Sequence, residues 1–172
     1  MNNTRKSEPE EKYTFGDRVF DSIMTMGITI IACLLLSTVV RTVVVSGQSM
    51  EPNYHNREVL LVRMNPDTSK LKYGDIVIAQ KSDYELIKRV IGLPGDKLEC
   101  HDGVLKRNGK IVKEPYIREK QNRDFTATIK KNHVFICGDN RNNSMDSRYF
   151  GQINMDRLHG RVITKLFQLP EK

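Results

Sequence analysis

The sequence predicts a mainly β domain of short antiparallel strands, preceded by one N-terminal helix that spans a membrane. Two observations lead to this fold class. A run of 19 residues without a charged side chain lies near the N-terminus. Beyond it, short apolar segments alternate with turn-forming residues, as in a chain of short strands joined by tight turns. We therefore divide the 172 residues into a tail over residues 1–21, a transmembrane anchor over 22–41 and a compact β-rich domain over 42–172.

The uncharged run extends from Ser22 to Val40. As a helix it would be about 28 Å long, close to the thickness of the hydrocarbon core of a bilayer. A buried core helix, a surface amphipathic helix and the apolar part of a cleavable signal are the alternatives. The run has no polar stripe and is longer than the usual signal core, and Arg41-Thr42-Val43 follows it in place of a small-x-small cleavage site. We therefore expect an uncleaved, single-pass anchor.

Basic residues predict the orientation of this anchor and one kind of partner. Four of the 28 Lys and Arg residues precede residue 22, and because Lys and Arg rather than net charge set orientation, we expect the N-terminus inside. The tail would be cytoplasmic and the β-rich domain would lie on the extracytoplasmic side of the cell membrane. Five of the 21 acidic residues also precede residue 22, so residues 22–172 carry a net charge of +8. This charge suits anionic headgroups of the lipid bilayer, and since no nucleic-acid-binding module is present, we predict no nucleic-acid partner.

Five short apolar segments beyond the anchor predict strands. They are residues 59–62, 76–78, 86–91, 134–137 and 161–167. In addition, Asn108-Gly109 separates residues 104–107 from 110–112, and this dipeptide is preferred in the type I′ turn of a two-residue hairpin.

The cysteines and histidines give no clear indication of a disulfide or a metal site. Cys33 lies in the predicted anchor, which leaves Cys100 and Cys137 as either a disulfide or two free thiols, and no spacing rule decides between them. The four histidines show no metal-binding spacing, and no Cys-x-x-Cys pair occurs. We therefore predict no metal and no cofactor.

Ser49 is the first candidate for chemistry. It lies between Gly47 and Pro52 directly beyond a Val-rich segment, where a rigid turn can expose its hydroxyl group as a nucleophile. Local sequence alone favours a simple turn-forming role. The segment 138–148 follows an apolar strand and is dense in hydrogen-bonding side chains. Such a segment can brace a site or form a polar surface loop.

Lys88 is the second candidate. Strand alternation places it on the same face as Leu86 and Val90, with no carboxylate beside it. If that face is buried, desolvation lowers the pKa of the lysine enough to make it a base. The alternative, which the local pattern favours, is a lysine that reaches solvent while Arg89 on the opposite face is buried and paired.

In their order behind the anchor, these segments resemble bacterial type I signal peptidase, the leader peptidase that cleaves exported preproteins. The matching motifs are Ser49-Met50-Glu51-Pro52, Gly74-Asp75-Ile76-Val77 and the segments 88–96 and 138–148. They cover most of residues 46–151, and the short domain is similar to the minimal form common in Gram-positive bacteria. The resemblance implies a membrane-bound serine endopeptidase that removes N-terminal signal peptides with a Ser/Lys dyad.

The resemblance also implies roles for residues. Ser49 would be the nucleophile, Lys88 the general base and Ser144 the residue that orients the lysine. Polar residues that brace the dyad would be Asp139, Asp146, Arg148 and Arg89. We expect secreted preproteins as substrates, with small residues one and three positions before the scissile bond. Their shallow apolar pockets would be lined by Val44, Met50, Leu86 and Ile87. We also expect the chain to act as a monomer.

Two departures from the family pattern affect the expected site. Gly47 stands where some members place a hydroxyl group for the oxyanion hole, so the backbone N–H of Ser49 would carry more of that task. Asn53 replaces the usual Thr, which predicts a changed turn. A self-cleaving repressor-type Ser/Lys protease and a catalytically inactive, membrane-anchored binding module are the alternative functions.

Overall fold

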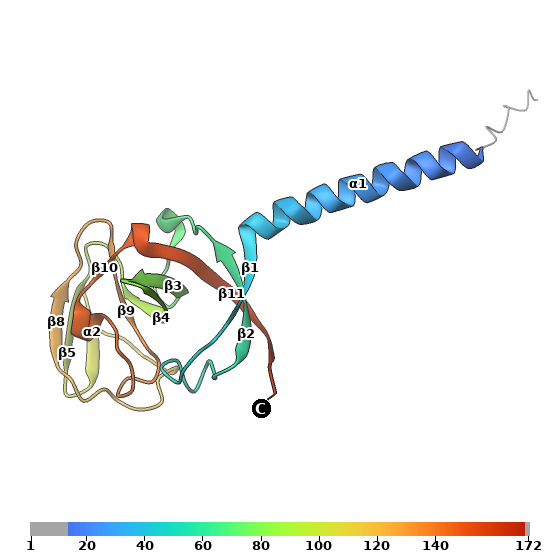
Figure 1. Cartoon of the computed structure of the whole chain (residues 1–172). Coiled ribbons are helices and arrows are strands. Elements are labelled where there is room, and N and C mark those ends of the chain that lie inside the picture. Colours follow the sequence, from blue (N-terminus) through green and yellow to red (C-terminus); the bar gives the residue numbers. More distant parts are fainter. Residues whose placement is uncertain (1–13, 171–172) are drawn as a thin grey trace, which may run out of the picture. The chain divides into compact units, whose positions relative to one another are not determined.

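The computed structural model describes residues 14–170 and divides into two units, an N-terminal helix and a β-rich unit from Val39 onward. The helix α1 spans Phe15–Val39 (Figure 1). Residues 1–13, most of the predicted tail, lie outside the described residues. The predicted fold class, a mainly antiparallel β domain after one apolar N-terminal helix, is confirmed.

The bounds of α1 follow from local chemistry. The helix begins earlier than the predicted anchor because Thr14 and Asp17 cap each other: the Thr14 N–H donates to the Asp17 carboxylate at 2.8 Å, and the Asp17 N–H donates to the Thr14 hydroxyl at 3.3 Å. It ends where strand β1 begins at Val40. The helix is long and apolar enough to cross a membrane, and none of the described side chains in its most apolar stretch is buried.

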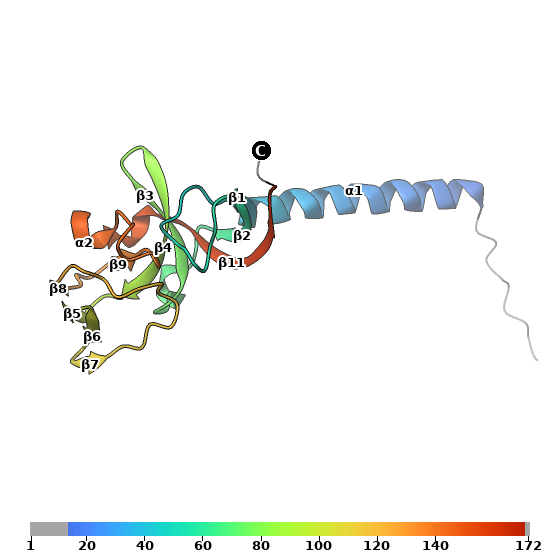
Figure 2. The same cartoon turned by 90° about the horizontal axis from the view of Figure 1, so that it is seen from below.

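The β-rich unit contains two antiparallel sheets (Figure 1). In spatial order, the first consists of β1 (Val40–Val44), β2 (Glu58–Met64), β11 (Leu158–Gln168), β3 (Ile76–Lys81), β4 (Tyr84–Gly92), β9 (His133–Cys137) and β10 (Ile153–Asn154). The second consists of β7 (Lys110–Ile111), β6 (Val104–Arg107), β5 (Lys97–His101) and β8 (Phe125–Thr128), which lie together in Figure 2. Short helical turns are η1 (Thr68–Lys70), α2 (Ser147–Phe150) and η2 (Met155–Arg157).

The predicted hairpin forms between β6 and β7. Arg107 pairs with Lys110, and the two residues between them have positive φ angles, 53° at Asn108 and 77° at Gly109. Both angles are those that a type I′ turn requires, so the Asn-Gly prediction is confirmed.

Strand β4 contributes side chains to two of the buried apolar clusters. Val90 packs in one buried cluster with Val77 and Ile136, whereas its neighbour Ile91 packs in another with Phe135. Side chains that alternate along a strand thus meet apolar neighbours on both sides, which holds β4 rigidly. The edge strand β1 is separated from β4 by three strands in the sheet order. The turn after β1 nevertheless reaches β4, and this approach creates the candidate site.

Candidate active site

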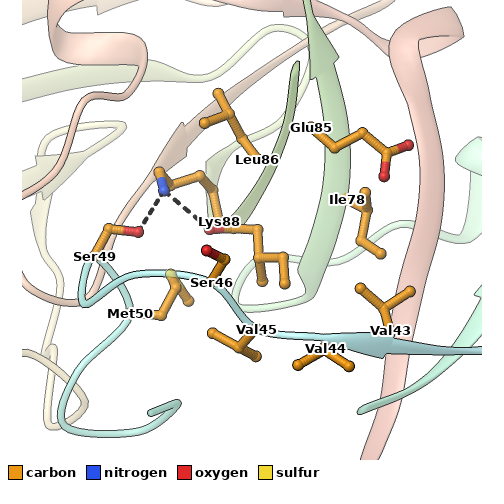
Figure 3. A pocket seen from close by; sticks show the side chains of 11 residues that line it. Val43, Val44, Val45, Ser46, Ser49, Met50, Ile78, Glu85, Leu86 and Lys88 are labelled. Carbon is orange, nitrogen blue, oxygen red and sulfur yellow. Dashed lines mark hydrogen bonds between the residues drawn. The ribbon is translucent and has the colours of Figure 1, made fainter. Parts of the chain in front are cut away.

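Ser49 and Lys88 are in direct contact. Lys88 Nζ donates a hydrogen bond to Ser49 Oγ at 2.7 Å and a second one to the carbonyl oxygen of Ile87 at 3.1 Å (Figure 3). Ser49 lies in the turn after β1, and Lys88 lies in the middle of β4. The two side chains that were predicted as candidates from separate segments of the sequence are therefore in contact in the structure.

The environment of Lys88 lowers its pKa and so increases the fraction of the neutral form. The residue is only 3% exposed, so its side chain is shielded from bulk solvent and does not extend to the surface as a free ammonium group. Burial lowers the pKa of Lys88 to about 8, and the nearby negative charge of Asp146 limits the decrease. With this pKa, roughly a tenth of the lysine is neutral at pH 7 and half at pH 8. Such a lysine can accept a proton from a bonded hydroxyl group.

The turn that presents Ser49 is held in place by the residue that follows it, Met50. Met50 is buried, and its carbonyl oxygen accepts hydrogen bonds from the backbone N–H groups of Asn53 at 3.1 Å and Tyr54 at 3.0 Å. Within residues 14–170, the backbone N–H of Ser49 donates to no acceptor, which leaves it available to a developing oxyanion. The N–H of Gly47 is engaged, since it donates to Asn56 Oδ1 at 3.0 Å.

Asp139 and Arg89 form a buried ion pair beside the lysine. Asp139 accepts hydrogen bonds from Arg89 Nε at 2.7 Å and Nη2 at 2.6 Å, and from Asn53 Nδ2 at 2.9 Å. The Arg89 guanidinium lies 4.1 Å from the ring centre of Tyr116. This bidentate geometry fixes the residue next to Lys88 against the segment 138–148.

A second buried ion pair joins Asp146 to Arg148. The carboxylate accepts from Arg148 Nε at 2.8 Å and Nη2 at 2.7 Å, from the Gly138 N–H at 2.9 Å and from Ser144 Oγ at 2.7 Å. Burial raises the pKa of Asp146, but the hydrogen bonds and positive charge of Arg148, together with the hydrogen bonds from Gly138 and Ser144, outweigh it, and the pKa lies below its ordinary value. Asp146 therefore stays ionised at neutral pH.

Ser144 lies close to the site without touching the lysine. Its hydroxyl donates to Asp146, and within residues 14–170 Lys88 donates only to Ser49 and Ile87. The contact between Ser144 and Lys88 is thus indirect, through the charge of Asp146, and the lysine-orienting role of Ser144 stays a prediction.

One buried pair was missed by reasoning from sequence. Arg141 donates from Nη2 to Glu114 Oε1 at 2.6 Å and from Nε to the Gly138 carbonyl oxygen at 3.0 Å. Tyr116 also donates to Glu114, at 2.9 Å. Arg141 lies inside a matching motif, but the segment around Glu114 offers no local signal. The segment 138–148 is therefore held from two directions: Glu114, which follows β7, bonds to Arg141, and Arg89 of β4 bonds to Asp139.

Ser49 and Lys88 line two cavities. One cavity has a volume of about 200 Å³, and its walls combine apolar side chains with polar and charged ones (Figure 3). It is lined by Val43, Val44, Val45, Ser46, Ser49, Met50, Ile78, Glu85, Leu86, Ile87 and Lys88. The four residues predicted to line substrate pockets are therefore all among its walls. A second cavity of about 500 Å³ is lined by Gln48, Asn56 and Asn143 beside the same Ser49 and Lys88.

Two buried cysteines and an acidic cluster at the surface are not part of this site. Cys100 and Cys137 are free thiols buried in one apolar cluster. At the surface of the described chain, His101, Asp102 and Asp124 bring their ligand atoms within 4.8 Å of one another. All three are exposed, and His101 Nδ1 pairs with Asp124 Oδ2 at 2.6 Å, so ion pairing accounts for the group.

An antiparallel β domain that contains a serine hydrogen-bonded to a buried lysine, and that follows an apolar helix in the sequence, is typical of a membrane-associated serine peptidase. Comparison with known proteins agrees. The sequence profile of the family described as signal peptidase, peptidase S26, matches residues 19–167. The chain therefore belongs to the signal peptidase family, peptidase S26.

Individual relatives and a solved structure support this membership. The chain is 39% identical to signal peptidase I S of Bacillus subtilis (strain 168) over 132 residues, 69% of this chain and 72% of the relative. It is 37% identical to signal peptidase I of Bacillus amyloliquefaciens, with 83% and 84% covered. A crystal structure of a signal peptidase I from Enterococcus faecalis V583 has 32% identity and a TM-score of 0.51, and the match covers 55% of this chain and 97% of that one.

Proposed function

We propose that this chain is a membrane-bound signal peptidase that removes N-terminal signal peptides from exported preproteins, with Ser49 as nucleophile and Lys88 as general base. The observation that carries the assignment of residues is the 2.7 Å hydrogen bond between Lys88 Nζ and Ser49 Oγ, together with the burial of Lys88. A lysine that is partly neutral at physiological pH and bonded to a serine hydroxyl satisfies the geometry that nucleophilic catalysis requires.

The reaction would proceed through an acyl-enzyme. Neutral Lys88 takes the proton of the Ser49 hydroxyl as Ser49 Oγ attacks the carbonyl carbon of the scissile bond. The free Ser49 N–H stabilises the oxyanion of the tetrahedral intermediate. The lysine then returns its proton to the leaving amine, and in a second cycle it activates the water that hydrolyses the ester. The buried pairs of Asp139 with Arg89 and Asp146 with Arg148 would hold both dyad elements in place.

The 200 Å³ cavity beside the dyad, with several apolar side chains in its walls, supports recognition of small residues before the scissile bond. An extended peptide that enters between β1 and β4 would place alternate side chains against its walls. Val44, Met50, Leu86 and Ile87 would limit the size of the side chains one and three positions before that bond. Ser144 would act on Lys88 through Asp146.

Membrane attachment completes the proposal. The apolar helix α1 would anchor the enzyme in the lipid bilayer as a single-pass, monomeric protein, with the N-terminus inside and the catalytic unit on the extracytoplasmic side of the cell membrane. Its substrates carry apolar signal segments in the same bilayer, so the anchor would raise their effective concentration near the site.

The test is cleavage of a preprotein by the full chain in detergent micelles. Ser49→Ala and Lys88→Ala should each reduce turnover by at least a thousandfold, whereas Ser69→Ala and Lys70→Ala, which change an exposed serine and an exposed lysine, should leave it unchanged. Cleavage that persists in either dyad variant would disprove the assignment of residues. No cleavage by the parent chain would favour an inactive binding module. Protease accessibility from each side of a vesicle tests the orientation.

A further inference from the structure

One carboxylate lies in the wall of the 200 Å³ cavity beside the dyad. Among the described residues that line this cavity, Glu85 is the single acidic one (Figure 3). It lies on β4 three residues before Lys88, and at about 3.3 Å per residue the two backbones are about 10 Å apart along the strand. Figure 3 shows Glu85 beside Ile78, on the side of the cavity that is remote from Ser49.

The Glu85 carboxylate is only partly satisfied by the protein. Its Oε1 pairs with His159 Nδ1 at 2.9 Å, and within residues 14–170 this imidazole is its partner. The two side chains are 54% and 37% exposed. A carboxylate that is half exposed gains little from a single surface partner, so it can exchange that partner for a Lys or Arg side chain at little cost. The protein as a whole carries a net charge of +7, so a negative group at this place is a local feature.

We propose that Glu85 determines specificity by favouring a basic side chain in the substrate segment before the scissile bond. The inference rests on the proposed function and refines its substrate class. If the residue before the scissile bond is held at Ser49 and Lys88, a chain extended along β4 reaches Glu85 about three residues further upstream. The favoured Lys or Arg would thus be the fourth or fifth residue before that bond, where it would replace the weaker contact with His159.

The experiment uses the full chain in detergent micelles and matched preproteins. Each preprotein carries Lys, Gln or Glu at the fourth or fifth position before the scissile bond, with small residues kept at the first and third. The parent enzyme should cleave the Lys substrate with a kcat/KM three- to tenfold above that of the Glu substrate at one of the two positions, because ion pairs at half-exposed sites are modest. The ratio should fall as the salt concentration rises.

Variants assign this preference to one residue. Glu85→Gln should bring the ratio close to one, and Glu85→Lys should invert it. His159→Asn removes the competing imidazole and should increase the ratio. Glu99→Gln is the matched control, since Glu99 is an acidic residue of β5 that does not line the cavity, and it should leave the ratio unchanged.

Two results would overturn the inference while the proposed function stands. One is a parent enzyme that cleaves the Lys, Gln and Glu substrates equally well. The other is a preference for Lys that survives in Glu85→Gln. Failure of the parent to cleave any of the preproteins would overturn the proposed function and the inference together.

Discussion

The backbone N–H of Asn140 donates a hydrogen bond to the carbonyl oxygen of Ser49 at 3.1 Å. The Asn140 side chain adds a second bond, from Nδ2 to the carbonyl oxygen of Gln48 at 3.1 Å. The turn that presents the candidate nucleophile is therefore fastened directly to the polar segment 138–148. This contact gives a physical reason why two motifs far apart in the sequence belong to one site: the segment sets the position of the Ser49 backbone.

The close approach of these segments predicts the effect of Gly138→Ala. A Cβ atom at Gly138 would overlap both the carbonyl oxygen of Ser49 and the hydroxyl of Ser144, and the first of these is backbone that cannot rotate away. We expect turnover to fall at least tenfold, with a stability loss of about 1–3 kcal/mol from overpacking. Preprotein cleavage and urea unfolding measure the two effects.

The control for this variant is Gly109→Ala. Gly109 has a φ of 77°, and a Cβ atom there would meet nothing within 4 Å. It should cost about 1 kcal/mol of turn strain and leave turnover unchanged. Equal turnover in the two variants would show that the approach of Gly138 to Ser49 has no catalytic importance.

The features of this structure that could be predicted from the sequence are those that depend on residues adjacent in the chain. The Asn108-Gly109 turn was predictable because only its own backbone angles matter. The face of Lys88 was predictable from strand alternation, whereas its burial was not, since this depends on what covers the strand. The pair of Arg141 with Glu114 joins residues 27 apart in the sequence. Contacts of that kind depend on how the two sheets pack, so no pattern around either residue indicates them.

Burial of Lys88 predicts a stability cost. The folded pKa of about 8 lies below the value of about 10.4 for an unfolded chain, so the unfolded state binds the proton more tightly. The cost is complete below pH 8 and disappears as the pH rises through 10.4. Lys88→Met keeps the length of the side chain and should raise the free energy of unfolding by about 3 kcal/mol at pH 7.

Urea unfolding at two pH values checks this prediction. The advantage of Lys88→Met over the parent should shrink to near zero at pH 10.5. Lys106→Met, at an exposed position of β6, should differ little from the parent at either pH. A Lys88→Met variant that is less stable than the parent at pH 7 would contradict the lowered pKa.

The ion pair of Arg89 with Asp139 should matter far more than a surface pair. Asp139 is fully buried, and Arg89→Ala would leave its charge with Asn53 as the remaining side-chain donor within residues 14–170. We expect a loss of about 3–5 kcal/mol of unfolding free energy. Arg118→Ala removes an exposed partner 3.8 Å from Glu51 and should cost less than about 1 kcal/mol. If both variants unfold at the same urea concentration, the buried pair does not stabilise the site.

The lowered pKa of Lys88 also fixes the direction of the pH dependence of catalysis. A base must be neutral before it accepts a proton, and with a pKa of about 8 the neutral fraction rises from roughly a tenth at pH 7 to roughly nine tenths at pH 9. The single-turnover rate on subsaturating preprotein, which reports the pKa of the free enzyme, should therefore rise about tenfold across this interval and level off above it. Single-turnover conditions ensure that chemistry, rather than product release, is observed. A rate that stays flat between pH 6 and 9 would exclude Lys88 as the base. Lys88→Arg sharpens the test, because a guanidinium keeps its charge throughout this range and should be inactive at every pH.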